Sequence, residues 1–268
     1  MKTVVITGSA RGLGLCMAKL FRENDYNVVI SDLNEDKLIA SKEELEKIDS
    51  KGNVLYKTCN VTKSSDIENL IEFCDEKLGN IDIWINNAGV NQPDKAIWEL
   101  SEEEIDLVLD VDLKGAIIGS KYAMNYMMKK GRGAIYNIEG YGSNDAMMLG
   151  LSIYGSSKRS ITYFTQALAK ESEERNTGVI VGRLSPGIMI TDFITNALGD
   201  KGKIELPEKT KKVYNILGDY PDVVANFLVN EMLKNTKNNA HIEWLTTGKA
   251  AWRFMTAGFN KRDFFKEK

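Results

Sequence analysis

Short runs of apolar, often β-branched residues alternate along the chain with longer segments whose apolar residues recur every three or four positions. Strands and helices that follow one another in this way favour a parallel sheet covered by helices on both faces. The short runs predict strands at 3–7, 27–31, 53–58, 81–85, 133–138, 178–183 and 241–245. The amphipathic segments predict helices at about 12–24, 34–49, 63–78, 101–130, 151–176 and 221–235. We therefore expect a doubly wound α/β fold with a seven-stranded parallel sheet.

The alternation runs along the chain without an internal repeat or a linker, so we expect one domain spanning residues 1–268. It breaks between about 188 and 220, a stretch that carries glycines and lysines. This stretch follows the sixth predicted strand, and ligands of open α/β sheets bind beyond the carboxyl ends of the strands. We predict that 188–220 forms a flap over a binding site.

The first predicted strand runs directly into a glycine-rich turn and then into a helix. Gly8 permits a tight turn, Gly12 allows the backbone to approach a phosphate, and Gly14 allows the helix to pack closely on the strand. The N–H groups at the start of the helix would complete a pyrophosphate site. The cofactor contacts expected here are Gly8, Ser9, Arg11, Gly12, Leu13 and Gly14. The pattern favours a Rossmann-type sheet, and a purely structural turn is the alternative for the glycines alone.

Asp32 closes the second predicted strand and is followed by Leu33. A carboxylate at this place accepts hydrogen bonds from both ribose hydroxyls of an adenosine and repels a 2′-phosphate. Arg11 complicates the choice, because a nearby arginine can neutralise a 2′-phosphate. The carboxylate holds the more discriminating place, so we expect a cofactor site with Asp32 and Leu33 in which NAD(H) is favoured over NADP(H). A helix N-cap is the alternative role for Asp32.

Polar segments also follow the third and fourth predicted strands. Residues 59–62 (Cys-Asn-Val-Thr) suit an adenine edge, or form an ordinary turn. Residues 86–89 (Asn-Asn-Ala-Gly) offer two amides that can brace neighbouring strands and line the floor of a cofactor site, or form a simple loop. The cofactor contacts expected from the two segments are Asn60, Val61, Asn87, Ala88 and Gly89.

Tyr154 and Lys158 lie at positions i and i+4 of a predicted helix, so their side chains share one face. A phenol with its ordinary pKa of about 10 is a poor acid or base near neutral pH. A neighbouring ammonium favours the phenolate and lowers that pKa. The pair would therefore exchange a proton with a carbonyl or alcohol oxygen without a histidine. Such pairs are also common on helix surfaces, so the pair indicates a catalytic site only in combination with the other motifs.

The composition argues against nucleic-acid binding, histidine-based catalysis and metal binding. The net charge is −3, with 35 basic and 38 acidic side chains mixed along the chain, so no nucleic-acid partner is expected. The lysines between 201 and 212 are interrupted by acidic residues and favour a solvated loop. His241 is the only histidine, so neither a His-based triad nor a metal site is expected.

Cys16, Cys59 and Cys74 lack metal-ligand spacing and lie in apolar contexts, which is typical of reduced cysteines in a cytosolic protein. No apolar run approaches the roughly 20 residues that span a bilayer. The chain begins with a predicted core strand, which leaves no room for a secretory signal. We therefore expect a cytoplasmic protein with no membrane span.

Taken in order, these motifs resemble the short-chain dehydrogenase/reductase family in its single-domain form, over nearly the whole chain. They are Thr7-Gly8-x-x-x-Gly12-x-Gly14, Asp32, Asn60-Val61, Asn86-Asn87-Ala88-Gly89, Tyr154-x-x-x-Lys158, and Ser185-Pro186-Gly187 with Thr191. The resemblance implies hydride transfer between a nicotinamide and a carbonyl or alcohol. It makes Tyr154 the acid/base, while Lys158 holds the nicotinamide ribose and lowers the tyrosine pKa. The nicotinamide contacts that it implies are Pro186, Gly187, Ile188 and Thr191.

Two positions depart from the family pattern. Glutamate and glycine stand at 139 and 140, where the family usually has serines, so Ser143 is the candidate catalytic hydroxyl. Asp112 stands where the family normally has an asparagine that relays protons through water to the lysine. An aspartate can accept from that water and would also stabilise the charged Lys158. We expect retained activity with an altered pH profile.

Residues 137–143 and the tail 244–265 are similar to the chlorophyll b reductase branch of the family, in which a corresponding segment carries the serine. Substrates there are large, flat and hydrophobic, and relatives that act on steroids would need a similar pocket. The apolar lining expected for it is Met147, Met148, Leu149, Leu151, Ile188, Met189 and Phe193, with core packing as an equal alternative for some of them.

The sequence thus predicts an NAD(H)-dependent oxidoreductase that interconverts a carbonyl and an alcohol on a bulky hydrophobic small molecule, with a hydroxysteroid as the first candidate. A chlorophyll b reductase-like enzyme is the alternative. A non-catalytic NAD(H) sensor and an epimerase or dehydratase on the same scaffold are further rivals. Family habit implies a homodimer or homotetramer formed through the helices at 101–130 and 151–176.

Overall fold

A computed structural model describes residues 1–190, 208–260 and 262–265. Its seven strands form one sheet in the order β3-β2-β1-β4-β5-β6-β7, and every neighbouring pair is parallel. The strands are β1 (Thr3–Thr7), β2 (Asn27–Asp32), β3 (Val54–Thr58), β4 (Ile83–Asn86), β5 (Gly133–Ile138), β6 (Val179–Ser185) and β7 (Ala240–Glu243). The predicted doubly wound parallel sheet is confirmed, with strand ends that differ by one or two residues.

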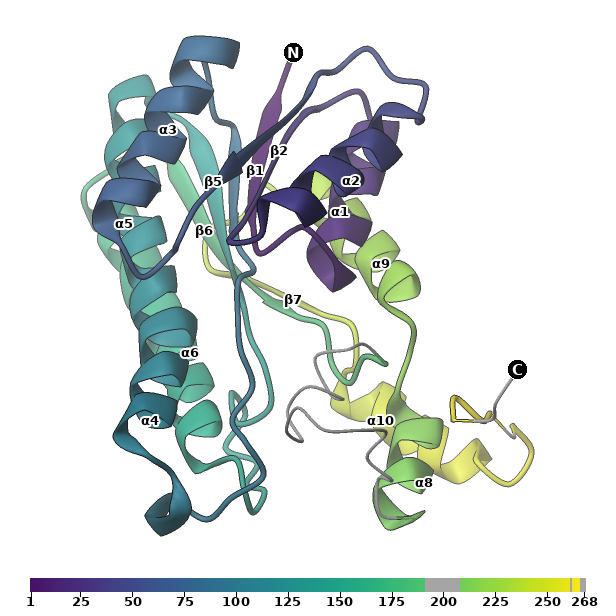
Figure 1. Cartoon of the computed structure of the whole chain (residues 1–268). Coiled ribbons are helices and arrows are strands. Elements are labelled where there is room, and N and C mark those ends of the chain that lie inside the picture. Colours follow the sequence, from purple (N-terminus) through teal and green to yellow (C-terminus); the bar gives the residue numbers. More distant parts are fainter. Residues whose placement is uncertain (191–207, 261, 266–268) are drawn as a thin grey trace.

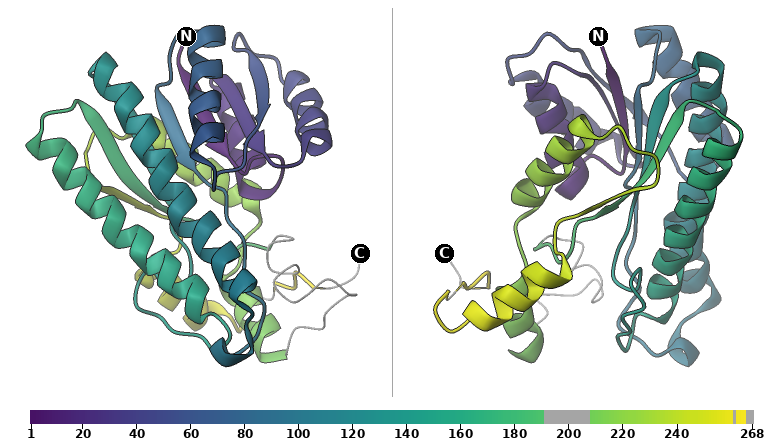
Figure 2. Two further views of the ribbon diagram at one scale, coloured as in Figure 1. Left: turned by 60° about the vertical axis from the view of Figure 1, so that its left-hand side comes forward. Right: turned by 180° about the vertical axis from the view of Figure 1, so that it is seen from behind.

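Helices cover both faces of this sheet, as Figures 1 and 2 show from three directions. One face carries α3 (Ser64–Leu78), α5 (Ala116–Lys130) and α6 (Ser152–Glu174). The other carries α1 (Gly12–Glu23), α2 (Glu35–Glu46) and α9 (Pro221–Lys234). Beyond the carboxyl edge of the sheet lie α4 (Glu102–Val108), α8 (Glu208–Leu217) and α10 (Thr247–Thr256).

Two hydrophobic cores result from the alternation of side chains along each strand. Val4 and Ile6 of β1 pack into the core shared with α1, α2 and α9. Val5, between them, packs into the core shared with α3, α5 and α6. Because β1 is buried on both faces, it reads as a continuous apolar run in the sequence.

The predicted helix 101–130 is interrupted. Its start is confirmed, since Ser101 Oγ accepts from the Glu104 N–H at 3.2 Å while a Glu104 carboxylate oxygen accepts from the Ser101 N–H at 2.9 Å. The segment Leu109–Gly115 then widens into a π-helix between α4 and α5. Such π-turns are often found at functional sites, and this one carries Asp112.

The sequence did not predict α10. This short helix keeps Trp252 and Met255 largely exposed and has no buried residue, unlike the helices that pack on the faces of the sheet. It begins at an N-cap, Thr246, and is held to the rest of the chain by Arg253, which contacts Asp219 at 2.7 Å. Most of the expected flap at 188–220, including Thr191 and Phe193, lies outside the described residues.

None of the helices in the described parts of the chain is long and apolar enough to cross a bilayer.

Candidate active site

The glycine turn packs against the loop after β4 so tightly that neither Gly8 nor Gly14 could carry a side chain without a clash. Gly8 has a φ of +61°, and a Cβ there would lie 2.6 Å from the Cα of Ala88. A Cβ on Gly14 would lie 2.6 Å from Nδ2 of Asn87. At Gly12, a Cβ would meet nothing within 4 Å, so the turn presents an open backbone surface there. This is the arrangement needed to approach a phosphate.

The start of α1 adds polar groups to that surface. Its N-cap, Arg11, is extended and exposed, and no described side chain caps the helix. The first turn holds no acidic residue. The N–H groups of this turn are therefore suited to an anion such as a pyrophosphate. Leu13, by contrast, is buried under the turn.

Asp32 lies at the carboxyl end of β2, beside the glycine turn. One of its carboxylate oxygens accepts from the Leu33 N–H at 2.8 Å, and the other accepts from the Ala10 N–H at 3.4 Å. The cap of α2 is a different residue, Asn34, whose side-chain oxygen accepts from the Lys37 N–H at 2.9 Å. The helix-cap alternative for Asp32 is therefore wrong.

Three other predicted cofactor contacts have side chains that serve the fold. Ser9 Oγ donates to the carbonyl of Ile6 at 2.6 Å and accepts from the Ser31 N–H at 3.0 Å. The side-chain oxygen of Asn60 accepts from the N–H and the hydroxyl of Thr62, which is the geometry of a local turn. Val61 is buried in the core. Any contact of these residues with a cofactor would use the backbone or the remaining amide.

Asn87 braces the strands as the sequence predicted. Its side-chain amide donates to the carbonyls of Thr7 and Gly8 at 2.9 and 2.8 Å. Thr7 Oγ1 in turn accepts from the N–H groups of Asn87 and Ala88. Gly89, two residues further on, lies against Asp112: a Cβ on Gly89 would be 3.3 Å from the Asp112 carboxylate. The loop after β4 thus joins the glycine turn to the π-helix.

Tyr154 and Lys158 lie together near the start of α6, both buried. The ammonium of Lys158 is 5.4 Å from the centre of the Tyr154 ring. It also lies 2.8 Å from Oδ2 of Asp112, which is 1% exposed. The lysine is therefore in a direct ion pair, and the expectation that Asp112 stabilises the charged Lys158 is confirmed. The water-mediated relay that the family pattern implies for this position stays a prediction.

This ion pair changes the expected acidity of the phenol. Burial raises the pKa of Tyr154 to about 12, and the attraction of Lys158 for the phenolate is opposed by the negative charge of Asp112. Burial alone would lower the pKa of Lys158, but Asp112 and Tyr154 keep it above its ordinary value. Lys158 thus lowers the pKa of the phenol as predicted, but burial outweighs it and the net shift is upward.

Ser143 is turned toward the backbone of α6. Its hydroxyl donates to the carbonyl of Lys158 at 3.2 Å and accepts from the Gly140 N–H at 3.2 Å. Gly140 itself faces the phenol, since a Cβ there would collide with the hydroxyl of Tyr154. Gly140, which stands where the family usually has a serine, therefore offers no hydroxyl to the substrate. Ser143 would have to give up its hydrogen bond to the carbonyl of Lys158 before its hydroxyl could donate to a substrate oxygen.

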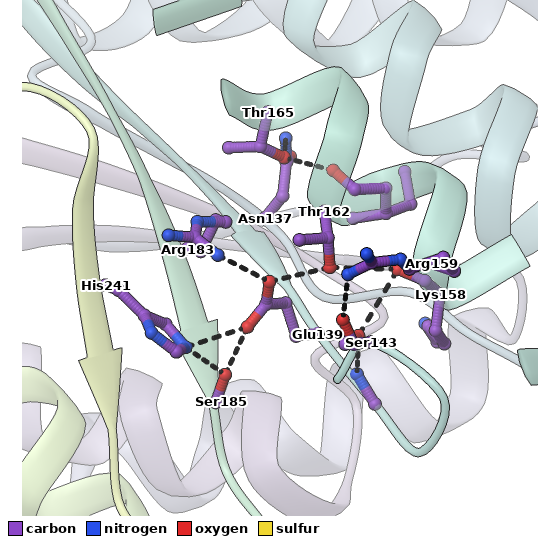
Figure 3. A network of polar contacts seen from close by, with 12 residues as sticks. Asn137, Glu139, Ser143, Lys158, Arg159, Thr162, Thr165, Arg183, Ser185 and His241 are labelled. Carbon is purple, nitrogen blue, oxygen red and sulfur yellow. Dashed lines mark hydrogen bonds and ion pairs between the residues drawn. The ribbon is translucent and has the colours of Figure 1, made fainter. Parts of the chain in front are cut away.

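Glu139, at the other unusual position, is the centre of a buried network that Figure 3 shows. It accepts from Thr162 at 2.7 Å, from Arg183 at 3.3 Å and from Ser185, and it contacts Nε2 of His241 at 3.0 Å. Although burial opposes ionisation, the hydrogen bonds from His241, Ser185 and Thr162 lower the pKa of Glu139 to about 2. The network ties β5, α6, β6 and β7 together just before the expected nicotinamide loop.

Ser185, His241 and Glu139 do not form a catalytic triad. Nε2 of His241 contacts both Ser185, at 2.8 Å, and Glu139. In a triad, opposite ring nitrogens serve the acid and the nucleophile. The sequence expectation that the single histidine forms no triad agrees with this geometry.

The expected nicotinamide loop follows directly. Pro186 is buried, and Gly187 has a φ of +73° with a Cβ position only 2.7 Å from Leu245. The carbonyl of Ile188 accepts from the Asp219 N–H at 3.0 Å. The fourth expected contact, Thr191, is outside the described residues.

The expected apolar lining divides into two groups. Met147 and Leu149 are 92% and 96% exposed, and Met148 is also exposed, in the loop just before α6. Met189, by contrast, packs against the core. The exposed group lies next to the helix that carries Tyr154 and is available to an apolar ligand, whereas core packing explains Met189.

Sequence reasoning missed Gln92. This buried residue follows the loop after β4, and its side-chain oxygen accepts from the N–H groups of Ile153 and Tyr154 at 2.8 and 3.2 Å. Its amide donates to the carbonyl of Lys95 at 3.3 Å. Gln92 therefore anchors the first turn of α6. No local pattern marks it, because its partners lie some 60 residues further along the chain.

Comparison with known proteins identifies the family. The family model described as short chain dehydrogenase matches residues 2–201. Chlorophyll(ide) b reductase NOL of Oryza sativa is 33% identical over 94% of this chain and 74% of its own length. Probable chlorophyll(ide) b reductase NYC1 of the same plant is 29% identical over 99% of this chain, which spans only 54% of that protein. A diacetyl reductase of Staphylococcus epidermidis is 32% identical over 72% of this chain and 73% of its own.

Solved structures show the same fold. The crystal structure of levodione reductase matches with a TM-score of 0.81 at 22% identity, over 93% of this chain and 98% of that one. An alcohol dehydrogenase from Thermococcus sibiricus, complexed with 5-hydroxy-NADP, matches with a TM-score of 0.74 at 24% identity, over 92% and 97% of the two chains. The family model matches residues 2–201, and relatives of about one third identity agree with the order of motifs in this chain. The chain therefore belongs to the short-chain dehydrogenase family of nicotinamide-dependent alcohol and carbonyl oxidoreductases.

Proposed function

We propose that this chain interconverts a carbonyl and an alcohol on a bulky hydrophobic substrate, with NAD(H) as the cofactor. The observation that carries the proposal is the buried pair of Tyr154 and Lys158, held at the start of α6 on the same sheet edge as the glycine turn. A buried phenol beside an ammonium can exchange a proton with a substrate oxygen. The open backbone at Gly12 supplies a place for the cofactor's pyrophosphate nearby.

The preference for NAD(H) rests on Asp32. Its carboxylate lies at the carboxyl end of β2, next to the turn, and it caps no helix. Two hydroxyls of an adenosine ribose would find acceptors there, whereas a 2′-phosphate would meet a like charge. Arg11 is the candidate to offset that repulsion, and it is exposed at the start of α1.

The residues would share the work as follows. The nicotinamide cofactor, when bound, accepts or donates the hydride. Lys158 would hold the nicotinamide ribose, and Pro186, Gly187 and Ile188 would bracket the ring. Tyr154 would exchange the proton with the substrate oxygen, while Ser143 is the candidate second hydroxyl. Positioning of the two reactants and stabilisation of charge on the oxygen supply the catalytic effect.

The substrate class rests on two observations. Met147, Met148 and Leu149 are exposed directly before α6, which favours a hydrophobic ligand over a small polar one. Relatives of about one third identity are named as chlorophyll(ide) b reductases, which favours a carbonyl on a large ring system. A hydroxysteroid also satisfies the first observation, so a large flat macrocycle and a steroid are the two candidates.

The test is a substrate screen with the purified chain. NADH and NADPH oxidation would be followed with polycyclic aldehydes, ketosteroids and diacetyl as the small polar control. We expect turnover with one of the two bulky classes, a higher kcat/KM with NADH than with NADPH, and little activity on diacetyl. Nucleotide binding without turnover on any carbonyl would support the sensor alternative, and preference for diacetyl would contradict the hydrophobic substrate class.

A further inference from the structure

We infer that Asp112 is a positioning residue that neutralises Lys158 and thereby favours the protonated form of Tyr154, which is the form that donates a proton in carbonyl reduction. This inference rests on the proposed function, and it adds which residue sets the protonation of Tyr154.

The carboxylate of Asp112 is fixed on both sides. Oδ2 lies 2.8 Å from the ammonium of Lys158, and Oδ1 accepts from the Val90 N–H at 2.7 Å. Asp112 is carried by the π-helix and Val90 by the loop after β4, so two separate segments hold the group. Its side chain is completely buried, and that of Lys158 is 6% exposed. Solvent therefore screens this ion pair only weakly.

Two charged groups face the phenol of Tyr154 in the described structure. Lys158 approaches from one turn along α6, and Asp112 approaches from the π-helix. Glu139, the nearby carboxylate that follows β5, is directed instead at Thr162, Arg183, Ser185 and His241. Because the two opposite charges lie 2.8 Å apart, Asp112 offsets part of the attraction that Lys158 exerts on the phenolate. Burial then dominates and keeps the phenol protonated.

The two directions make opposite demands on the phenol. In reduction, the carbonyl carbon gains the hydride of a reduced nicotinamide and the oxygen gains the phenolic proton, leaving a phenolate that solvent reprotonates. In oxidation, a phenolate must first accept the proton of the alcohol. A phenol that ionises well above pH 7 is ready for the first role across the neutral range and for the second only at alkaline pH.

The test titrates Tyr154 directly in the cofactor-free protein, so that it does not depend on turnover. Tyrosine labelled with ¹³C at Cζ would be followed by NMR against pH, with Tyr154→Phe to assign the signal. Wild-type Tyr154 is expected to ionise above the ordinary range, and Asp112→Asn is expected to lower the midpoint by about one pH unit or more. The matched control is Asp110→Asn, which removes an exposed carboxylate from the same π-helix, paired with Lys114 at 3.1 Å. It should leave the midpoint unchanged.

The pH dependence of the oxidation rate should shift in the same direction as the pKa of Tyr154. Asp112→Asn should move the alkaline rise of the oxidation rate to lower pH. The midpoint of that rise should fall by the same number of pH units as the midpoint of the Tyr154 titration. An ordinary or low midpoint for wild-type Tyr154 would overturn the inference, as would an unchanged midpoint in Asp112→Asn. If Asp112→Asn does not fold, the wild-type titration decides alone. Absence of nucleotide binding and turnover in the wild type would instead refute the proposed function.

Discussion

The side-chain oxygen of Gln92 accepts a hydrogen bond from the backbone N–H of Tyr154 at 3.2 Å, and a shorter one from Ile153. Gln92 belongs to the segment that follows β4, whereas Tyr154 stands in the first turn of α6. The N-cap of α6 is Leu151, which provides no side-chain acceptor. One buried amide therefore fixes the helix start that carries the phenol.

Gln92→Met keeps the volume of the side chain but removes this acceptor. We expect a loss of about 1–3 kcal/mol in the free energy of unfolding, since N–H groups beside a buried site lose their partner. We also expect a lower kcat, because the first turn of α6 can then shift. Urea unfolding and steady-state kinetics measure the two effects. Gln92→Glu retains the acceptor next to the positive end of the helix and should recover part of both; equal behaviour of the two variants would contradict the anchoring role.

Tyr154→Phe removes the phenolic proton and little else. Turnover should fall by about 10²–10⁴-fold, while the affinity for NADH stays within a few-fold, because the ring and Lys158 remain. Stopped-flow turnover and fluorescence titration with NADH separate the two quantities. Tyr163→Phe, at an exposed position on the same helix, is the matched control. Turnover near the wild-type level would remove Tyr154 from the mechanism.

Asp32→Ser removes the carboxylate from the edge of the glycine turn. The kcat/KM with NADH is expected to fall about tenfold, which corresponds to the loss of one charge-assisted hydrogen bond. The value with NADPH should rise, because the repulsion of the 2′-phosphate disappears. Glu35→Gln, at an exposed position in the first turn of α2, controls for the general loss of a negative charge. A wild-type enzyme that already prefers NADPH would contradict the assignment.

Glu139→Gln tests the buried network of Figure 3. Because the pKa of Glu139 is lowered to about 2, its ionised form stabilises the folded chain above the unfolded pKa, near 4.3. That contribution, of the order of 2–3 kcal/mol, is lost as the pH falls from about 4 toward 2. Urea unfolding of both proteins should therefore show a large difference in stability at pH 7 and a smaller one near pH 3. An equal difference at both pH values would show that the carboxylate charge is not responsible.

Much of the cofactor half of the site could be predicted because its geometry is local. Gly8, Gly12 and Gly14 belong to one strand–turn–helix unit, and Tyr154 and Lys158 are one helical turn apart. Both arrangements depend on fixed backbone periods, so spacing alone gives the relative placement of the side chains. Asp32 could be placed for the same reason, since the carboxyl ends of parallel strands meet at one edge.

The rest of the site depends on residues far apart in the chain. Gln92 reaches α6 across 61 and 62 positions, and Glu139 meets Ser185 across 46. Nothing in the local pattern marks such partners, because the order of strands in the sheet decides which loops become neighbours. The exposed helix α10 was missed for a related reason, since it lacks a buried stripe and is held by Asp219 through Arg253.

The sequence by itself determined the alternation of strands and helices, the glycine turn, the carboxylate after the second strand and the tyrosine–lysine pair, since each follows from short-range spacing. Only the tertiary structure decided that Asp112 pairs directly with Lys158, that Gly140 faces the phenol while Ser143 bonds to the backbone of α6, and that burial raises the pKa of Tyr154. The physical reason is that a pKa depends on the water excluded and on the charges brought close by packing, and neither is encoded in the spacing of residues along one helix.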